Sequence, residues 1–409
     1  NERGRHVRHC RVRGRQRLPV LRDGIKSLDG RMGRTPSSHR LRGRALLISQ
    51  LLLSIDYGLP RRESVCTAFA RLGDVALLQC ALNVGCPWGW STCYAAALAG
   101  HLHVLKWARK KQLAWGKHVC EGAARGGHLD VLQWARHHGR TWTSSTTCVA
   151  AEGGHLAVLK WAREKGCPWD VTTCFLAARE GHLHVLKWAH NNGSPWNDWV
   201  CCGAARGGHL RVLRWARDVG LSWNAATCEA AASGGHLEVL KWARANGCPW
   251  NSSTCSGAAL DGNLHVLKWA RANGCPWSSA TSCVAARGGH LEVLTWVREN
   301  GCPWDATTFF VAARGGHLSV LTWARENGCL WNDWTCWGAA RGGHLDVLRW
   351  ARRHGFPWNA ATCEAAALGG HLDVLKWARV NGCPWDQRTC SKAALGGHLG
   401  LLKWAKANG

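Results

Sequence analysis

The sequence lacks any long apolar run. The longest, Ala45–Leu53, is interrupted by Ser49 and Gln50 and is far shorter than the roughly 20 apolar residues that a membrane-spanning helix needs. Residues 1–44 carry arginines where a secretory signal would need an apolar centre. These two absences predict an intracellular protein without membrane contact, in the cytoplasm or alternatively in the nucleus.

Acidic residues are scarce. The chain has 52 Lys and Arg against 26 Asp and Glu, a formal net charge of +26. The triplet Arg-Gly-Arg occurs at 3–5, 13–15 and 42–44, so residues 1–44 could form an arm for nucleic acid or nuclear import. We favour a basic, disordered leader, because charged runs are more often solvated tails. Translation starting at Met32, the single methionine, is another interpretation of this segment.

Motifs of catalysis and metal binding are absent as well. There is no nucleophile elbow, phosphate loop or His-Glu-x-x-His sequence. The 22 cysteines include no Cys-x-x-Cys pair, so we expect them to be free and to pack as small apolar residues. The sequence therefore predicts neither an enzyme nor a metal site, and it implies no cofactor and no small-molecule substrate.

One tripeptide, Gly-His-Leu, recurs along most of the chain. Its histidines are separated by 27 residues, or by 54 where Asn263 replaces one, and Asp74 stands one unit before the first. This fixed period predicts a repeat protein of about 13 units. The turn histidines are His101, His128, His155, His182, His209, His236, His290, His317, His344, His371 and His398.

Each unit has the pattern of two helices. Asn359 is a strong N-cap for the first helix of a representative unit, and Gly369 and Gly370 end it. A second helix follows from about Leu372 to Asn381, with Gly382 as its stop. The pattern predicts an all-α solenoid of helix-turn-helix repeats.

One helix pair cannot bury its own apolar face, so the units must stack on one another. The small pair Ala366 and Ala367 lets neighbouring backbones approach, and we expect the regular tryptophans to fill the core. Because Asp74 and Asn263 replace the turn histidine and both are good caps, we expect this position to cap the second helix. Histidines spread along a stack do not converge on one metal ion.

The repeat register sets the expected domain organisation. It extends back to a degenerate N-terminal capping helix at 45–61, and the solenoid occupies 62–409. The last residue, Gly409, is a helix-stop glycine without a polar cap, which suggests a cut chain. Within 141–409 a five-unit block is duplicated, since 148–151 matches 283–286 after 135 residues.

The string Ala339–Leu348 resembles the helix-turn-helix core of ankyrin repeats, over about residues 62 to 409. The resemblance implies a curved solenoid that binds proteins on its concave side. The ankyrin unit is six residues longer, and the missing residues belong to its β-hairpin finger. The concave surface should therefore consist mainly of first helices. Tetratricopeptide and HEAT repeats match less well, because their periods are longer.

Some aromatic residues stand outside the regular tryptophan positions. We expect Trp199 and Trp334 in the loops and Phe175, Phe310 and Trp337 on the first helices, near arginines of those helices. Aromatic and arginine side chains together are typical of interface hot spots, although these rings could instead thicken the packing. The predicted partner-binding residues are Phe175, Arg179, Trp199, Arg206, Phe310, Arg314, Trp334, Trp337 and Arg341. The predicted function is a scaffold for another protein; the alternative is nucleic-acid binding through residues 1–44 and the basic solenoid.

Overall fold

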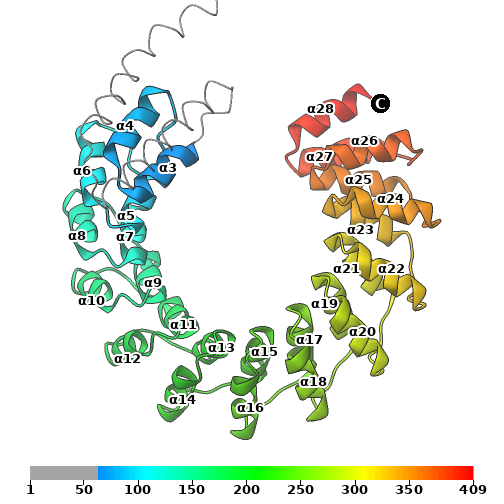
Figure 1. Ribbon diagram of the computed structural model, residues 1–409, viewed down its shortest axis with the longest axis horizontal. Helices are drawn as coiled ribbons and strands as arrows, with labels where there is room; N and C mark the ends of the chain where they lie inside the picture. Colours follow the sequence, from blue (N-terminus) through cyan, green and yellow to red (C-terminus); the bar gives the residue numbers. More distant parts are fainter. Residues whose placement is uncertain (1–62, 409) are drawn as a thin grey trace, which may run out of the picture. The chain divides into compact units, whose positions relative to one another are not determined.

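The computed structural model describes residues 63–408, so the predicted leader and capping helix lie outside the described residues. The chain divides into two compact units, 1–122 and 123–409. Between residues 63 and 408 there are 26 helices and no strand (Figure 1), which confirms the all-α prediction. None of these helices has the length and apolarity needed to cross a membrane.

The helices alternate between first and second helices of a unit. In residues 63–122 they are α3 (Glu63–Leu72), α4 (Val75–Asn83), α5 (Trp90–Leu98) and α6 (Leu102–Lys110), and the boundary between the two compact units falls within α7 (Val119–Gly126). The remaining first helices are α9 (Ser144–Glu152), α11 (Val171–Arg179), α13 (Trp199–Arg206), α15 (Ala225–Ser233), α17 (Ser252–Leu260), α19 (Ser279–Gly288), α21 (Ala306–Gly315), α23 (Trp334–Gly342), α25 (Ala360–Gly369) and α27 (Gln387–Leu395). The remaining second helices are α8 (Leu129–His137), α10 (Leu156–Glu164), α12 (Leu183–Asn191), α14 (Leu210–Asp218), α16 (Leu237–Ala245), α18 (Leu264–Ala272), α20 (Leu291–Glu299), α22 (Leu318–Glu326), α24 (Leu345–Arg353), α26 (Leu372–Val380) and α28 (Leu399–Ala407).

The ends of the helices follow the local sequence signals. The Asn359 side chain accepts a hydrogen bond from the Ala361 backbone nitrogen at 3.0 Å, as an N-cap should. Gly370 and Gly382 have φ of +80°, a left-handed conformation that side-chain-bearing residues adopt only at a cost. The 27-residue spacing of helix starts follows from repeating these signals.

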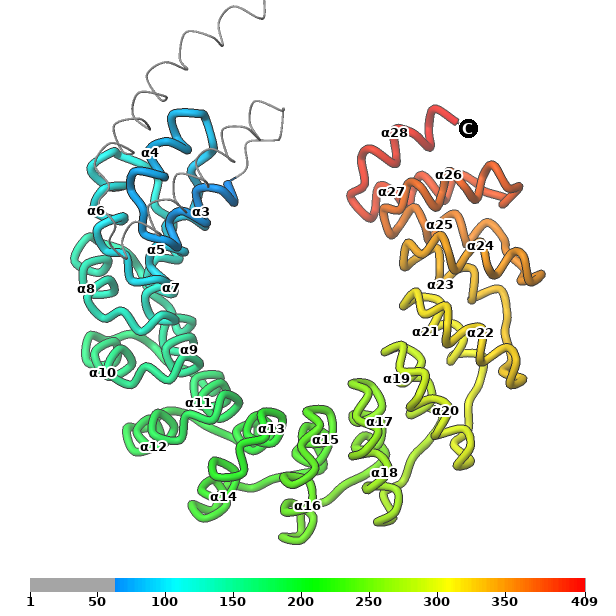
Figure 2. Tube along the Cα trace, viewed as in Figure 1, coloured from blue at the N-terminus to red at the C-terminus, as the bar shows by residue number. Residues whose placement is uncertain are grey.

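The core of residues 123–409 consists of small and branched side chains. Val374 and Leu375 of α26 and the alanine pair Ala366 and Ala367 of α25 are fully buried, as are their equivalents in the preceding pair, α23 and α24. Because alanine and glycine line the facing surfaces, the first helices pack closely side by side, whereas neighbouring second helices touch much less. From residue 123 to residue 408, the first helices form one row and the second helices form another (Figure 2).

The regular tryptophans do not form the buried core that we expected. Their rings are only partly buried, and they lie on the second helices and in the loops that follow them. Trp277, for example, packs edge to face on Trp296 with ring centroids 5.8 Å apart. The Arg271 guanidinium lies 4.0 Å from the Trp277 ring centroid. An indole is too large for the alanine-lined space between first helices, so it occupies the wider gaps between second helices.

The turn histidines also differ from their expected role. They stand at the N-cap position, but the side chains make no capping hydrogen bond. Instead, the His317 ring nitrogen Nε2 bonds the Arg287 carbonyl oxygen of the preceding unit at 2.9 Å. Asn263 makes the same kind of link to the Ser233 carbonyl at 2.8 Å. Asp74 does cap its helix, because a carboxylate accepts from the Ala76 and Leu77 nitrogens.

Candidate functional site

The predicted residues of the second five-unit block come together on α21 and α23. The Phe310 ring centroid lies 5.8 Å from that of Trp337 and 6.3 Å from that of Trp334. Trp334 and Trp337 are themselves 5.8 Å apart. Trp334 is 55% exposed, so the three rings form a partly open aromatic cluster.

Close packing of the two helices creates this cluster. Phe310 and Trp337 hold the same place in consecutive units, 27 residues apart. Gly338 allows the approach, because a Cβ there would lie 2.8 Å from the Phe310 carbonyl oxygen. The first-helix packing that forms the core thus also sets the spacing of the rings.

Three arginines accompany the cluster. Arg314 and Arg341 each lie four residues after an aromatic ring, on the same helix face, and Arg287 holds the same place one unit earlier. Among the described residues, none of the three forms an ion pair. The aromatic cluster with these arginines is called here the aromatic–arginine surface.

The first five-unit block has a smaller version of this surface. Phe175 and Trp199 lie 6.4 Å apart, but Cys202 takes the place of Trp337. The Arg179 guanidinium pairs with Glu152 at 2.8 Å, and Arg206 donates to the Ser233 hydroxyl at 2.7 Å. The predicted arginines of this block are therefore already occupied by partners in neighbouring units.

Sequence reasoning missed two kinds of residue at these surfaces. Glu152 and Ser233 hold the same place as the arginines in the adjoining units, and their polar side chains were the available signal. Leu330 and Trp331, in the loop before α23, are 74% and 41% exposed. Residues 329–331 read Cys-Leu-Trp where most units have Cys-Pro-Trp, and this difference was the signal that could have identified the loop as part of the surface.

Among residues 63–408 no group of three or more His, Cys, Asp or Glu side chains could hold a metal ion. The cysteines there are free, and most are buried. Burial raises the pKa of the Cys201 and Cys336 thiols to about 12, which keeps both in the unreactive neutral form at neutral pH.

Paired helices, glycine turns and short loops make the described residues of each compact unit a stack of helix-turn-helix repeats, which resemble ankyrin repeats. No family model matches the chain, and no curated protein matches it. Among solved structures, the crystal structure of the human ASB11 ankyrin repeat domain is similar at 17% identity with a TM-score of 0.32. The match covers 38% of this chain and 84% of that one. The assignment therefore rests on the repeat's own features.

Proposed function

We propose that this chain is a non-catalytic scaffold that binds a protein partner on its first helices. The observation that supports this proposal is the aromatic–arginine surface. It joins the rings of Phe310, Trp334 and Trp337 to three arginines without ion-pair partners among the described residues.

The chemistry of this surface suits a protein partner with apolar and acidic side chains. Aromatic rings supply contact area at little cost in conformational entropy, and arginines bind carboxylates through two parallel hydrogen bonds. In the first block the equivalent arginines already have partners within the chain. We therefore place the main contact at α21 and α23.

The double substitution Trp337→Ala with Arg341→Ala tests this proposal. Affinity capture with the full chain should lose proteins that the unchanged chain retains, while the Tm stays nearly the same. The control is Trp199→Ala with Arg206→Ala, at the positions equivalent to Trp334 and Arg341, and this variant should retain most of the capture. A large fall in Tm for the first variant would instead assign these side chains to packing. Unchanged capture at unchanged Tm would place the contact elsewhere.

Nucleic-acid binding is the second candidate, because residues 1–62 carry 16 Lys and Arg against 4 Asp and Glu. Such binding weakens steeply as salt rises, since counterions are released from the phosphates. Deletion of residues 1–44 should then abolish retention on a nucleic-acid column. Retention that survives this deletion, or that ignores salt, would count against the arm.

A further inference from the structure

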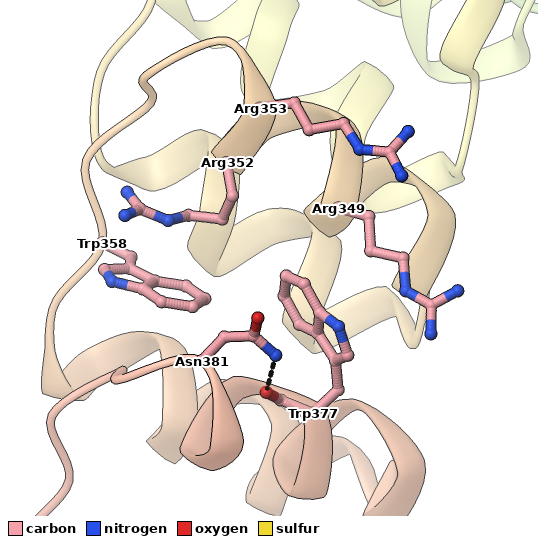
Figure 3. Close-up of a pocket in the computed structure, with 6 residues that line it drawn as sticks. All are labelled: Arg349, Arg352, Arg353, Trp358, Trp377 and Asn381. Atoms are coloured by element: carbon pink, nitrogen blue, oxygen red, sulfur yellow. Dashed lines mark hydrogen bonds between the residues drawn. The ribbon is translucent and has the colours of Figure 1, made fainter.

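A pocket of about 500 Å³ lies among the second helices and loops near the C-terminal end of the described residues. It is lined by Arg349, Arg352, Arg353, Trp358, Trp377 and Asn381 (Figure 3). We infer that this pocket binds a phosphate monoester attached to an aromatic group. The inference is independent of the proposed function, because none of the lining residues belongs to the aromatic–arginine surface.

Two of the three arginines extend toward the same side. Figure 3 shows Arg349 and Arg353 pointing together, while Arg352 lies over Trp358. The Arg352 guanidinium is 4.3 Å from that ring centroid and donates to the Phe356 carbonyl oxygen at 2.6 Å. Arg352 is therefore part of the pocket wall. The Arg349 guanidinium lies 5.8 Å from the Trp377 ring centroid, and Arg349 and Arg353 are the two arginines that can bind an anionic ligand.

The aromatic wall is held in place by the repeat. The Trp358 and Trp377 ring centroids lie 5.8 Å apart at 65°. Asn381 fixes the floor by donating from Nδ2 to the Trp377 carbonyl oxygen at 2.8 Å. Neither indole is fully buried, so the rings can contact a planar group whose anionic end reaches the arginines.

A second site in the chain shows which residue makes this pocket different. On α14, Arg217 lies 4.4 Å from Trp223 and Arg214 lies 5.7 Å from Trp242; the Trp223 and Trp242 rings are 5.6 Å apart at 69°. Asn246 matches Asn381 as well, donating to the Trp242 carbonyl at 2.8 Å. The geometry is nearly the same, but Asp218 stands where α24 has Arg353.

Arg353 reverses the charge that several other units carry at this position. Glu164, Glu299 and Glu326 hold the equivalent place in their units. Within the described residues, neither Arg349 nor Arg353 forms an ion pair, and no carboxylate lines the pocket. Two guanidiniums that form no ion pair within the described residues, beside a third, suit a doubly charged anion better than a single carboxylate.

The experiment uses the full chain and phenyl phosphate, with isothermal titration calorimetry at about 0.15 M salt. Arg353→Glu and Arg349→Thr should each weaken binding at least about tenfold, because each removes charge-assisted hydrogen bonds. Both residues occur at the equivalent positions of other units, as Glu299 and Thr295 do. The repeat therefore accommodates them, and circular dichroism checks the fold.

The site on α14 provides both a control and a gain of function. Arg214→Thr should leave the affinity for phenyl phosphate unchanged, because Asp218 already excludes an anion there. Asp218→Arg should add one binding site of similar affinity. If Arg214→Thr weakens binding as much as Arg349→Thr, the chain attracts anions by its general charge, and the inference is overturned.

Two further ligands test the chemistry. Benzoate, with the same ring but one charge, should bind more weakly than phenyl phosphate. Affinity for phenyl phosphate should also fall below about pH 6, where the phosphate takes up its second proton. Equal binding of benzoate, or no measurable binding of phenyl phosphate, would contradict the inference.

The last comparison identifies the source of the phosphate. A short peptide with phosphotyrosine should bind more tightly than phenyl phosphate if the natural ligand is a modified protein. Equal affinity would indicate that a free aromatic phosphate fills the pocket. In either case Arg353→Glu must weaken binding, and failure to do so overturns the assignment.

Discussion

Most turns between the two helices of a unit depend on a histidine and on glycines from two units. The His290 ring bonds the Leu260 carbonyl oxygen at 2.9 Å and lies against the turn of the preceding unit. A Cβ on Gly262 would lie 2.7 Å from His290 Nδ1. The turn is therefore a contact between units, and changes there should weaken stacking rather than one helix pair.

A pair of glycine substitutions distinguishes the cost of a collision with the histidine ring from the cost of a left-handed backbone conformation. Gly262 and Gly274 have φ of +77° and +81°, but a Cβ on Gly274 would meet nothing within 4 Å. Gly274→Ala should cost about 1–2 kcal/mol from its left-handed conformation alone. Gly262→Ala should cost clearly more, measured by urea unfolding, because the new methyl group collides with the His290 ring. Equal costs would mean that the ring moves aside freely.

The histidine itself can be tested with a substitution that the chain already contains. His290→Ala leaves the Leu260 carbonyl without its bond and should cost about 1–3 kcal/mol. His290→Asn should recover part of that loss, as Asn263 bonds the Ser233 carbonyl. Hydrogen exchange of α17 and α19 measures the effect. A loss for Asn as large as for Ala would show that ring packing, not the hydrogen bond, dominates.

The tryptophans join units at the scale of the second helix. An arginine in the last turn of one second helix stacks on the loop tryptophan that follows, and that ring packs against a tryptophan of the next second helix. In the unit of α18 these are Arg271, Trp277 and Trp296. The same guanidinium donates to the Cys275 carbonyl oxygen at 2.5 Å. The contact therefore stabilises both the loop and the junction.

Removal of this arginine should lower the free energy of unfolding in units where its guanidinium stacks on the loop tryptophan. Arg271→Ala loses a cation–π contact and a carbonyl hydrogen bond, together about 1–2 kcal/mol. Arg325→Ala is the matched control, because Arg325 is exposed and its loop ring, Trp331, stacks on Phe356 at 4.2 Å instead. Thermal unfolding should show a smaller loss for Arg325→Ala. The reverse order would contradict a stabilising role for the stack.

Local signals predicted the elements well and their contacts less well. Asn359, Gly370 and Gly382 set helix ends through backbone geometry, which depends only on neighbouring residues. The indole rings lie where the spacing between neighbouring helices is wide enough for them. The spacing of tryptophans in the sequence does not show which row of helices is the wider one. Among the predicted contact residues, the pairing of Arg179 with Glu152 depends on the adjacent unit. The aromatic cluster was predictable because its rings recur in register.

At the scale of the whole molecule, units contact mainly their neighbours, so stability should be close to a sum of units and junctions. Deletion of 252–278 removes one period and brings Asn251 next to Ser279. Asn251 now accepts from the Ser253 nitrogen at 3.0 Å. After the deletion it should cap α19 in the same way, and the chain should keep its helical circular dichroism per residue and unfold within several degrees of the original Tm.

A deletion out of register provides the comparison. Removal of 252–275 places Pro276 directly after Asn251 and leaves the loop of one unit against the cap of another. The helix α19 keeps its own N-cap, Ser278, but the loop before it is three residues longer than in the other units and contains both Trp250 and Trp277. We expect this chain to lose cooperative unfolding and to gain protease-sensitive sites near the junction. Equal behaviour of the two deletions would mean that the 27-residue register does not control how neighbouring units stack.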